Sequence, residues 1–525
     1  MPEMSRDRRV FEMSADATRI LAIYLPQYYE TADNNLWYGQ GFTDWVAVKD
    51  AEAYFHGHQQ PKVPLEYNYY DLTNKSVMQY QAELAKKYGI DGFCFYHYYF
   101  KNGKMELEVP AENLLKWKDI EMPFCFNWAS SSWIRSWSRF GGNSWADKYD
   151  YLGTEATGDV LVEQKYGDFE DWKKHFEYLL PFFCDDRYIK VDGKPVFIFF
   201  NAESISSLED MVSCWREEAR KSGFDGLYLI GNTTSTVLPS MDAYMIYEPQ
   251  NCLVRYRNRH DISIRNGVKC FQYDLMWNEI INTPVMCGKK TYLCALSGYD
   301  TTPRRGKDGE VLLETSPNVF QVGLTELLKR SIKRKNEFLF IDAWNEWGEG
   351  MYLEPDEDSG FQYLEAVKKS VDEALSGIEG YTDFGNVISL ESQIHIAQKK
   401  TQRLQSLFSL LNKWCFCLEE GKISFQKYMN KRNCHDIAVY GIGAIGKHVI
   451  FRLKQEHINI KFVIDRYASF SNESFKVYRP ESELPQVDLI VITAYDNGEI
   501  AKKLLEHGLN NSIYLAEMLD DMLSG

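Results

Sequence analysis

The sequence of 525 residues contains no run of 18 apolar residues, so no segment has the hydrophobic length of a membrane-spanning helix. Residues 1–18 are polar and charged and lack the apolar stretch of a signal peptide. A basic surplus is also missing. The formal net charge is -16, which argues against nucleic acid as a partner because phosphate binding needs a positive surface. We therefore expect a cytoplasmic protein with a flexible segment at 1–18, and leave open an association with the surface of the inner membrane.

Clustered metal ligands and nucleophile motifs are missing as well. The eleven cysteines are scattered, mostly inside apolar segments, which indicates reduced thiols. Cys415 and Cys417 form a single C-x-C without a second pair, so a zinc site is not expected. His56, His58 and His97 do not have the spacing of metal ligands. Neither Ser-His-Asp nor Cys-His spacing stands out, and we predict no catalytic metal.

One stretch, residues 338–350, combines a buried strand with a polar end. Phe338 to Ile341 is an uninterrupted apolar run, typical of a strand buried on both faces. The chain then becomes polar within a few residues and reaches Glu346 and Glu349. Because α/β folds build their sites at the carboxyl ends of strands, we expect these side chains to reach a cavity.

The two glutamates suit the chemistry of a glycosidic bond. One carboxyl group protonates the departing oxygen, and the other stabilises or helps to form the cationic sugar centre. Their spacing of three residues puts the carboxyls about 5–10 Å apart. Trp344 and Trp347 beside them suit stacking on sugar faces. The alternative is that both glutamates only cap a following helix, but the flanking Trp, Asn and Gly residues make capping alone a poorer explanation.

Eight apolar strand candidates alternate with helical segments, which predicts a (β/α)8 barrel. The predicted strands are 19–28, 92–100, 123–128, 195–201, 227–232, 243–248, 291–297 and 338–343. The predicted helices are 75–88, 112–117, 168–183, 208–222, 271–281, 318–334 and 356–375.

Most predicted strands end in side chains that can bind a sugar. The candidates at these ends are Tyr24, Gln27, His97, Tyr98, Asn127, Trp128, Glu248, Asn345 and Trp347. For any one of them, a buried polar group satisfied within the protein is an equally good explanation. The prediction of a carbohydrate site depends on the whole set converging at one end of one barrel.

These motifs also resemble a known family. The segment Trp344-Asn345-Glu346-Trp347-Gly348-Glu349-Gly350, followed by Tyr352-Leu353-Glu354-Pro355, is similar to the motif of the WbsX family. These proteins of bacterial surface-polysaccharide gene clusters are usually called glycosyltransferases and are related to glycoside hydrolase family 99, the endo-α-mannosidases. The hydrolases show W-N-E-W-H-E-G here, so this chain has Gly348 where they have a histidine.

Further blocks extend the resemblance over residues 19 to 375. They occur in the order of the family and are Ala22 to Tyr28, Gly41-Phe42-Thr43-Asp44-Trp45, Gly57 to Pro61, Tyr70 to Leu72 and Thr302-Pro303-Arg304-Arg305. The resemblance adds Trp45 to the candidate substrate-binding residues. It also implies sugar transfer, with Glu349 as the acid/base and Glu346 acting at the 2-position of the sugar.

After the barrel the pattern changes. We place the barrel at 19–376, a helical connector at 377–433 and a small Rossmann-like domain at 434–525. The connector has an apolar face formed by Ile396, Leu404, Leu407, Leu411 and Trp414. A coiled-coil dimer arm is the alternative, but the repeat is short and irregular.

The predicted Rossmann-like domain contains a complete G-x-G-x-x-G. Its glycines are Gly441, Gly443 and Gly446, and Asp465 follows at nearly the spacing of an acid that binds ribose. Such a loop suits a nucleotide or nucleotide-sugar, because backbone N–H groups and a helix N-terminus can face a diphosphate. The same glycines also serve helix–strand packing alone, and both interpretations remain open.

Together these patterns predict a carbohydrate-active enzyme that makes or remodels surface polysaccharide, with an oligosaccharide or polysaccharide substrate. The resemblance favours a glycosyltransferase. The first alternative is an endo-acting glycoside hydrolase, which uses the same chemistry with water as acceptor. The second is a non-catalytic glycan-binding protein whose last domain senses a nucleotide. The sequence leaves open the sugar, the linkage, the stereochemical outcome, the donor and the oligomeric state.

Overall fold

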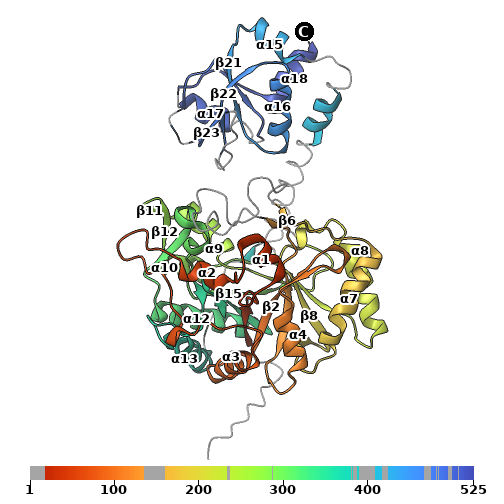
Figure 1. Ribbon diagram of the computed structural model, residues 1–525, viewed down its shortest axis with the longest axis vertical. Coiled ribbons are helices and arrows are strands. Elements are labelled where there is room, and N and C mark those ends of the chain that lie inside the picture. Colours follow the sequence, from red (N-terminus) through yellow and green to blue (C-terminus); the bar gives the residue numbers. More distant parts are fainter. Residues whose placement is uncertain are drawn as a thin grey trace, which may run out of the picture. The chain divides into compact units, whose positions relative to one another are not determined.

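The computed structural model describes residues 18–134, 160–232, 237–286, 288–379, 381, 383, 387–388, 408–416, 424–465, 475–480, 482, 484–494, 499–506 and 508–524 (Figure 1). The chain divides into two compact units, residues 1–393 and 394–525. The flexible segment predicted at 1–18 lies outside the described residues, apart from residue 18, and so do Ile396, Leu404 and Leu407 of the predicted connector face.

The first unit is built on a parallel sheet in the order β14-β10-β9-β8-β4-β2-β1-β17-β15. Its strands are β1 Arg19–Tyr24, β2 Gly92–Tyr99, β4 Phe124–Trp128, β8 Lys194–Phe199, β9 Tyr228–Asn232, β10 Ala243–Met245, β14 Lys290–Tyr292, β15 Cys294–Leu296 and β17 Phe338–Asp342. They are short and apolar because helices cover their outer side and side chains fill the interior. Figure 1 shows the helices around these strands.

The sheet closes at one interrupted strand. β14 and β15 are separated only by Leu293, and they form their ladders with different neighbours: β14 pairs with β10 and β15 pairs with β17. The Leu293 carbonyl accepts the Phe340 N–H at 3.0 Å, which continues the ladder across the break. Counted as one strand, β14 and β15 complete a ring of eight. The predicted (β/α)8 barrel is confirmed, and each of the eight predicted strands overlaps an observed strand of the ring.

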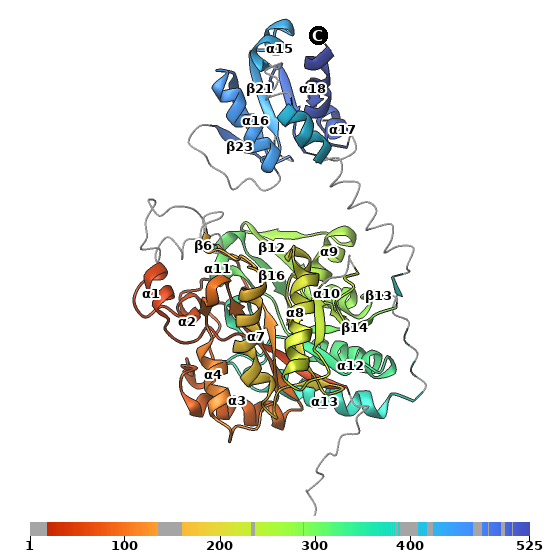
Figure 2. The same cartoon turned by 90° about the vertical axis from the view of Figure 1, so that its right-hand side faces the viewer.

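Helices follow most strands on the outside of the ring, as Figure 2 also shows. They are α3 Lys75–Lys87, α4 Val109–Lys116, α7 Phe169–Phe183, α8 Leu208–Lys221, α10 Tyr273–Ile281, α12 Pro317–Lys333 and α13 Gln362–Ser376. Their starts follow from local chemistry. The Asn74 side chain caps α3, and Asp168 with Asp171 forms a capping box at α7. Their buried faces join the strand residues in one continuous core.

Shorter elements lie between the strands and helices of the barrel. The helices are α1 Ala32–Tyr38, α2 Asp44–Lys49, α9 Gln250–Arg259 and α11 Thr302–Arg305, with 3₁₀ turns η1 Leu65–Tyr67, η2 Lys101–Gly103, η3 Ala202–Ser204, η4 Gly306–Asp308 and η5 Trp347–Glu349. The strands are β3 Met105–Glu106, β5 Trp133–Ile134, β6 Val160–Val162, β7 Lys190–Val191, β11 Ser263–Arg265, β12 Val268–Gln272, β13 Val285–Met286, β16 Glu310–Leu313, β18 Asn345–Glu346, β19 Met351–Tyr352 and β20 Val387–Ile388.

The second unit is a parallel five-stranded sheet in the order β23-β22-β21-β24-β25. Its strands are β21 Asp436–Tyr440, β22 Asn459–Ile464, β23 Lys476–Tyr478, β24 Leu489–Ile492 and β25 Ser512–Tyr514, and its helices are α15 Phe425–Lys431, α16 Ala444–Gln455, α17 Glu499–Glu506 and α18 Leu515–Ser524. The strand order reverses between β21 and β24, as in a Rossmann-like fold. Residues 408–416 form a further helix, whose Trp414 is buried in the core of this unit.

None of the helices in the described part of the chain combines the length and hydrophobicity needed to cross a membrane. In the same part of the chain, no group of three or more His, Cys, Asp or Glu side chains is arranged to bind a metal ion.

Candidate active site

The two glutamates lie in a tight hairpin directly after β17. Asn345 and Glu346 form β18, Trp347 to Glu349 form the 3₁₀ turn η5, and Met351 with Tyr352 returns antiparallel as β19. The side chain of Asn345 fixes the start of the hairpin, because it accepts the Leu25 N–H at 2.8 Å and donates to the Leu25 carbonyl at 3.0 Å. Both glutamates are therefore held at the carboxyl end of the barrel strands.

One guanidinium joins both glutamates. Arg304 donates through Nη2 to Glu346 Oε1 at 2.5 Å and through Nη1 to Glu349 Oε1 at 2.7 Å. A third carboxylate, Asp44 in α2, accepts from Arg304 Nη2 at 3.0 Å and from Nε at 3.3 Å. Because one planar group binds an oxygen of each glutamate, the two carboxyls are held next to each other.

This cluster carries more negative than positive charge and is largely buried. Asp44, Arg304 and Glu346 are buried, whereas 18% of the Glu349 side chain is exposed. Burial raises the pKa of Glu346 well above its usual range, and the carboxylates of Glu349 and Asp44 add to this effect while Arg304 opposes it. One of the two glutamates thus has the raised pKa that a general acid needs near neutral pH.

Gly348 gives the Arg304 and Asp44 side chains the space they occupy. A Cβ added there would lie 2.6 Å from Asp44 Oδ2 and 2.7 Å from Arg304 Nε. These distances are far shorter than ordinary contacts, so any side chain at this position displaces part of the cluster. A histidine at this position, as in the hydrolase motif, would therefore not fit beside the Arg304–Asp44 pair as it is arranged here.

A cavity of about 300 Å³ opens over the cluster, and we call it the glutamate cavity. Glu346, Glu349 and Arg304 line it, together with Gln27 and Tyr98 from the predicted set. Aromatic and polar side chains complete its wall, among them Trp37, Tyr96, Trp133, Tyr247 and Gln250. Aromatic faces beside hydrogen-bonding groups suit a sugar ring.

The two motif tryptophans face away from this cavity. Trp344 and Trp347 are 0% and 1% exposed, and their indole N–H groups donate to Glu354 at 3.0 and 2.7 Å. Trp347 also stacks on Tyr352 with ring centroids 3.7 Å apart. Glu354, from the segment after the hairpin, thus orients both rings inward, and neither presents a free face to a ligand.

Several other predicted residues are also enclosed by partners within the barrel. Tyr24 donates to Gln81 at 2.7 Å, Trp45 donates to the Tyr70 carbonyl at 2.8 Å, and Trp128 donates to the Tyr99 carbonyl at 3.1 Å. The Nε2 atoms of His97 and His175 lie 2.8 Å apart, and burial lowers the pKa of His97 to about 3. With Asn345 and Trp347, these residues support the site and do not line the cavity.

Asn127 differs from this enclosed group. Its side chain is fully buried, and neither its amide nitrogen nor its oxygen has a hydrogen-bond partner among the described residues. It lies near the end of β4 next to Tyr96 of β2, its partner in the ladder, and the Tyr96 hydroxyl contacts that of Tyr247. Asn127 is not among the residues that line the glutamate cavity.

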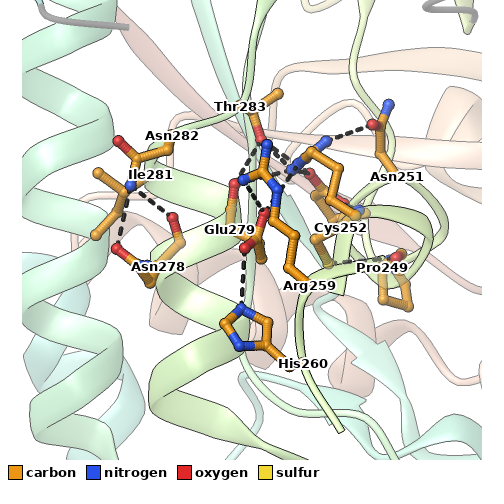
Figure 3. A network of polar contacts seen from close by, with 12 residues as sticks. Pro249, Asn251, Cys252, Arg259, His260, Asn278, Glu279, Ile281, Asn282 and Thr283 are labelled. Atoms are coloured by element: carbon orange, nitrogen blue, oxygen red, sulfur yellow. Dashed lines mark hydrogen bonds and ion pairs between the residues drawn. The ribbon is translucent and has the colours of Figure 1, made fainter. Parts of the chain in front are cut away.

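Glu248 belongs to a network behind the cavity wall. Its Oε2 accepts the Cys252 N–H in the first turn of α9 at 2.7 Å, and Arg255 lies 3.6 Å from its Oε1. Figure 3 shows the same network around Glu279 of α10, which binds Arg259 at 2.9 Å and His260 at 3.1 Å. Burial raises the pKa of Glu248 to about 7. These contacts join α9 to α10, and Glu248 does not line the glutamate cavity.

Arg304 and Asp44 were not among the predicted site residues. Both occur in the blocks on which the family resemblance rests, and that was the only signal for them in the sequence. Periodicity could not reveal the pair, because 260 residues separate them along the chain. Only the closed barrel brings α2 and α11 to the hairpin.

The glycine loop of the second unit connects β21 to α16. A Cβ on Gly446 would lie 2.0 Å from the Gly441 carbonyl oxygen, so close packing requires a glycine there. Gly441 has a φ of 99°, which also favours glycine. At Gly443 a Cβ would meet nothing within 4 Å. Asp465 was predicted to bind a ribose. Its side chain accepts the Ile442 N–H at 2.6 Å and so closes the loop.

Comparisons with known proteins agree with the motif resemblance. The family model described as Glycosyltransferase WbsX matches residues 20–367. The uncharacterised protein WxcX of two strains of Xanthomonas campestris pv. campestris is similar: it is 27% identical over 366 residues in strain B100 and 28% over 375 residues in strain ATCC 33913. Each match covers 68% of this chain and 50% of WxcX, so the chain spans about half the length of these relatives.

Two solved structures are also similar. The GH99 endo-alpha-mannosidase from Bacteroides thetaiotaomicron aligns with a TM-score of 0.42 at 13% identity, covering 69% of this chain and 99% of that one. A glycoside hydrolase-like protein aligns with a TM-score of 0.43 at 13% identity, covering 70% and 97%. The family match is the stronger finding. Because it covers well over half of the chain and includes Asp44, Arg304 and both glutamates, the protein belongs to the WbsX glycosyltransferase family.

Proposed function

We propose that this protein is a glycosyltransferase of bacterial surface-polysaccharide biosynthesis, such as the formation of O-antigen or capsule, and that Glu346 and Glu349 carry its chemistry. The observation that supports this most directly is the pair of glutamates joined through Arg304 at the wall of one cavity. The cavity has the aromatic and hydrogen-bonding lining of a sugar site.

We assign the roles of the two glutamates by the family resemblance. Glu349, the more exposed of the two, protonates the leaving oxygen, and Glu346 acts at the 2-position of the sugar. Burial raises the pKa of Glu346. Arg304, the common partner of both glutamates, holds the two carboxyls next to each other.

Two alternatives remain. The first is an endo-acting glycoside hydrolase, in which water takes the place of the sugar acceptor in the same cavity. The resemblance of the glutamate motif to that of the family 99 hydrolases brings this alternative forward. The second is a non-catalytic glycan-binding protein, for which the cavity would suffice without the pair of carboxyls.

Mass spectrometry of products decides between these functions. The full chain is incubated with nucleotide sugars plus an acceptor glycan, and separately with α-mannosides in water. Transfer predicts an acceptor that has gained one sugar, hydrolysis predicts shortened mannosides, and a glycan-binding protein gives neither product.

Variants of the two glutamates test the site. Glu346→Gln and Glu349→Gln should each lower the rate by about 10²–10⁴-fold, the usual scale for acid–base groups, while Glu365→Gln on the exposed face of α13 serves as the matched control. A substrate with an activated leaving group should rescue Glu349→Gln and not Glu346→Gln. Equal rescue of both would refute the role assignment, and full activity of both would refute the site.

A further inference from the structure

A second cavity of about 290 Å³ lies behind the catalytic hairpin, and we call it the Ser297 cavity. Gly350 and Tyr352 line it, whereas Glu349 and Met351 line the glutamate cavity, and Tyr299 borders both. Met351 and Tyr352 form β19, in which successive side chains point to opposite sides. The two cavities therefore share one thin wall.

The shared wall is held together by close backbone contacts. The Asp300 N–H donates to the Glu349 carbonyl at 2.7 Å. A Cβ on Gly298 would lie 2.7 Å from the Gly350 carbonyl oxygen, so the absence of a side chain allows the segments to touch. A ligand in the Ser297 cavity would thus press against the back of the segment that carries Glu349.

The lining contains a polar group that lacks a partner inside the protein. Ser297 is 2% exposed, it lines the cavity, and its Oγ has no hydrogen-bond partner among the described residues. A buried hydroxyl is normally satisfied, by water if not by protein. The Oγ itself is buried, and rotation of the Ser297 side chain about χ1 would bring it to the cavity and to a hydrogen bond with a ligand there.

Other polar groups of the lining already have partners. His58 accepts the Tyr54 N–H at Nδ1, so its Nε2 carries the proton that is donated to Asp300 at 2.8 Å. Asp356 accepts the Tyr352 hydroxyl at 2.7 Å. These groups form the wall, and the open positions are left to Ser297 and to the side chains nearer the mouth.

The charges of the lining exclude one class of ligand. Four carboxylates border the cavity and only one lysine: the acids are Asp300, Glu314, Asp356 and Asp358, and the cation is Lys62, which lies 3.6 Å from Asp358. Such a surface repels phosphates and uronic acids. The rings of Phe55, Tyr299, Tyr352 and Tyr363 provide faces on which an uncharged ring can pack.

We propose that the Ser297 cavity is a second saccharide subsite that binds a neutral or amino sugar, with Ser297 Oγ bonded to a sugar hydroxyl. The inference rests on the proposed function, since it assumes a glycan substrate. It adds a binding position outside the glutamate cavity and a preference against anionic sugars.

Titrations of the full chain by saturation-transfer NMR test this proposal, with glucosamine as the probe and glucose 6-phosphate as its anionic counterpart. Ser297→Ala should weaken glucosamine binding about fivefold, the effect of one lost hydrogen bond, without lowering the Tm. Ser331→Ala is the matched control, because Ser331 is equally buried with an unpartnered Oγ but lies in α12 and does not line the cavity. Asp358→Lys should weaken glucosamine binding and make glucose 6-phosphate binding detectable.

The proposal is overturned if Ser297→Ala and Ser331→Ala bind glucosamine equally, because the sugar then occupies another position or none. It is also overturned if the unaltered protein binds glucose 6-phosphate as well as glucosamine. Binding is measured without turnover, so these outcomes are separate from the loss of turnover in Glu346→Gln, on which the proposed function depends.

Discussion

At the scale of single residues, Arg304 organises the candidate site. It is the only cation in direct contact with Asp44, Glu346 and Glu349 among the ion pairs of the described residues. Buried carboxylates without a partner are costly, so the three acids depend on this side chain. Arg304 is thus both a structural requirement of the hairpin and a link between the two catalytic candidates.

Replacing Arg304 by Met tests that dependence. The variant keeps an unbranched side chain but removes the charge, which leaves Asp44 and Glu346 buried without a cation. We expect the free energy of unfolding, measured with urea, to fall by about 3–5 kcal/mol. Asp44→Asn, which removes one acid from an acid-rich cluster, should cost less. A variant as stable as the unaltered protein would contradict the assigned role of Arg304.

Glu248 links the stability of the barrel to pH. Burial raises its pKa to about 7, above the usual value of about 4.3. A carboxyl whose folded-state pKa is raised gives stability that is fully present below the unfolded value and is lost as pH rises through the folded value. Glu248→Gln abolishes this titration, so the variant should gain stability relative to the unaltered protein between pH 5 and 8.

Urea titrations at pH 5, 6, 7 and 8 measure this difference. The pKa shift corresponds to a change on the order of 3 kcal/mol across the range. Only the difference between the two proteins is compared, because the buried His97 and His175, whose pKa values are lowered, make stability rise with pH in the unaltered protein and in the variant alike. Parallel pH profiles would show that Glu248 does not titrate in this way.

At the scale of elements, the sequence pattern predicted the barrel well because its signal is local. Each strand is a short apolar run between turns, and helix caps such as Asn74 and Asp168 are visible directly. The position of the two glutamates was also predicted correctly. Residues that directly follow a strand must lie at its carboxyl end. The break at Leu293 divides the predicted strand 291–297 into β14 and β15. The apolar sequence of this strand gives no sign of the break.

The direction in which side chains point was far less predictable. Trp344 and Trp347 stand beside the glutamates in sequence, but Glu354 turns both indoles inward through hydrogen bonds. Likewise Arg304 reaches the site only through tertiary contacts. A local pattern shows which residues arrive at the end of a strand, whereas partners from distant segments decide which of them face the cavity.

The hairpin's Gly348 allows a test at this scale. A Cβ there would lie within 3 Å of both Asp44 and Arg304, two buried charged groups that cannot move without losing each other. Gly348→Ala should therefore destabilise the barrel by about 1–3 kcal/mol, the usual cost of overpacking, and lower turnover. Gly443→Ala, at a position with nothing within 4 Å, is the matched control for stability. If both substitutions are equally harmless, the contact is not as tight as described.

The glycine loop after β21 offers another test. Close packing requires glycine at positions 446 and 441. At position 443 there is space for a side chain, so packing does not explain Gly443. We propose that the loop binds a nucleotide or nucleotide-sugar. Gly446→Ala should destabilise the second unit, and Gly443→Ala should not. Gly443→Val should abolish the binding of a nucleoside diphosphate in calorimetry, and an unaltered protein that binds none would leave packing as the only role of the loop.

At the scale of the whole molecule, the two units have separate cores, and contacts of the barrel extend past its predicted end at 376. Asp383 binds Arg330 at 3.0 Å and Arg334 at 2.7 Å, and β20 pairs with β13. Arg330 is 2% exposed, so its charge depends on such partners. These contacts place Asp383 and β20 with the barrel.

Truncation tests this division, and the two possible end points should behave differently. A chain ending at residue 393 keeps Asp383 and β20, so it should fold and show the thermal transition of the barrel in the full protein. A chain ending at 376 removes the carboxylate from Arg330 and the partner strand of β13, and we expect its Tm to be several degrees lower. Differential scanning calorimetry of both chains and of the full protein measures this directly.

Arg330→Met in the chain ending at 376 should recover part of the loss, because no unpaired charge then remains buried. If the two truncated chains melt together, residues 377–393 contribute nothing to the barrel, and if neither folds, the barrel depends on the second unit.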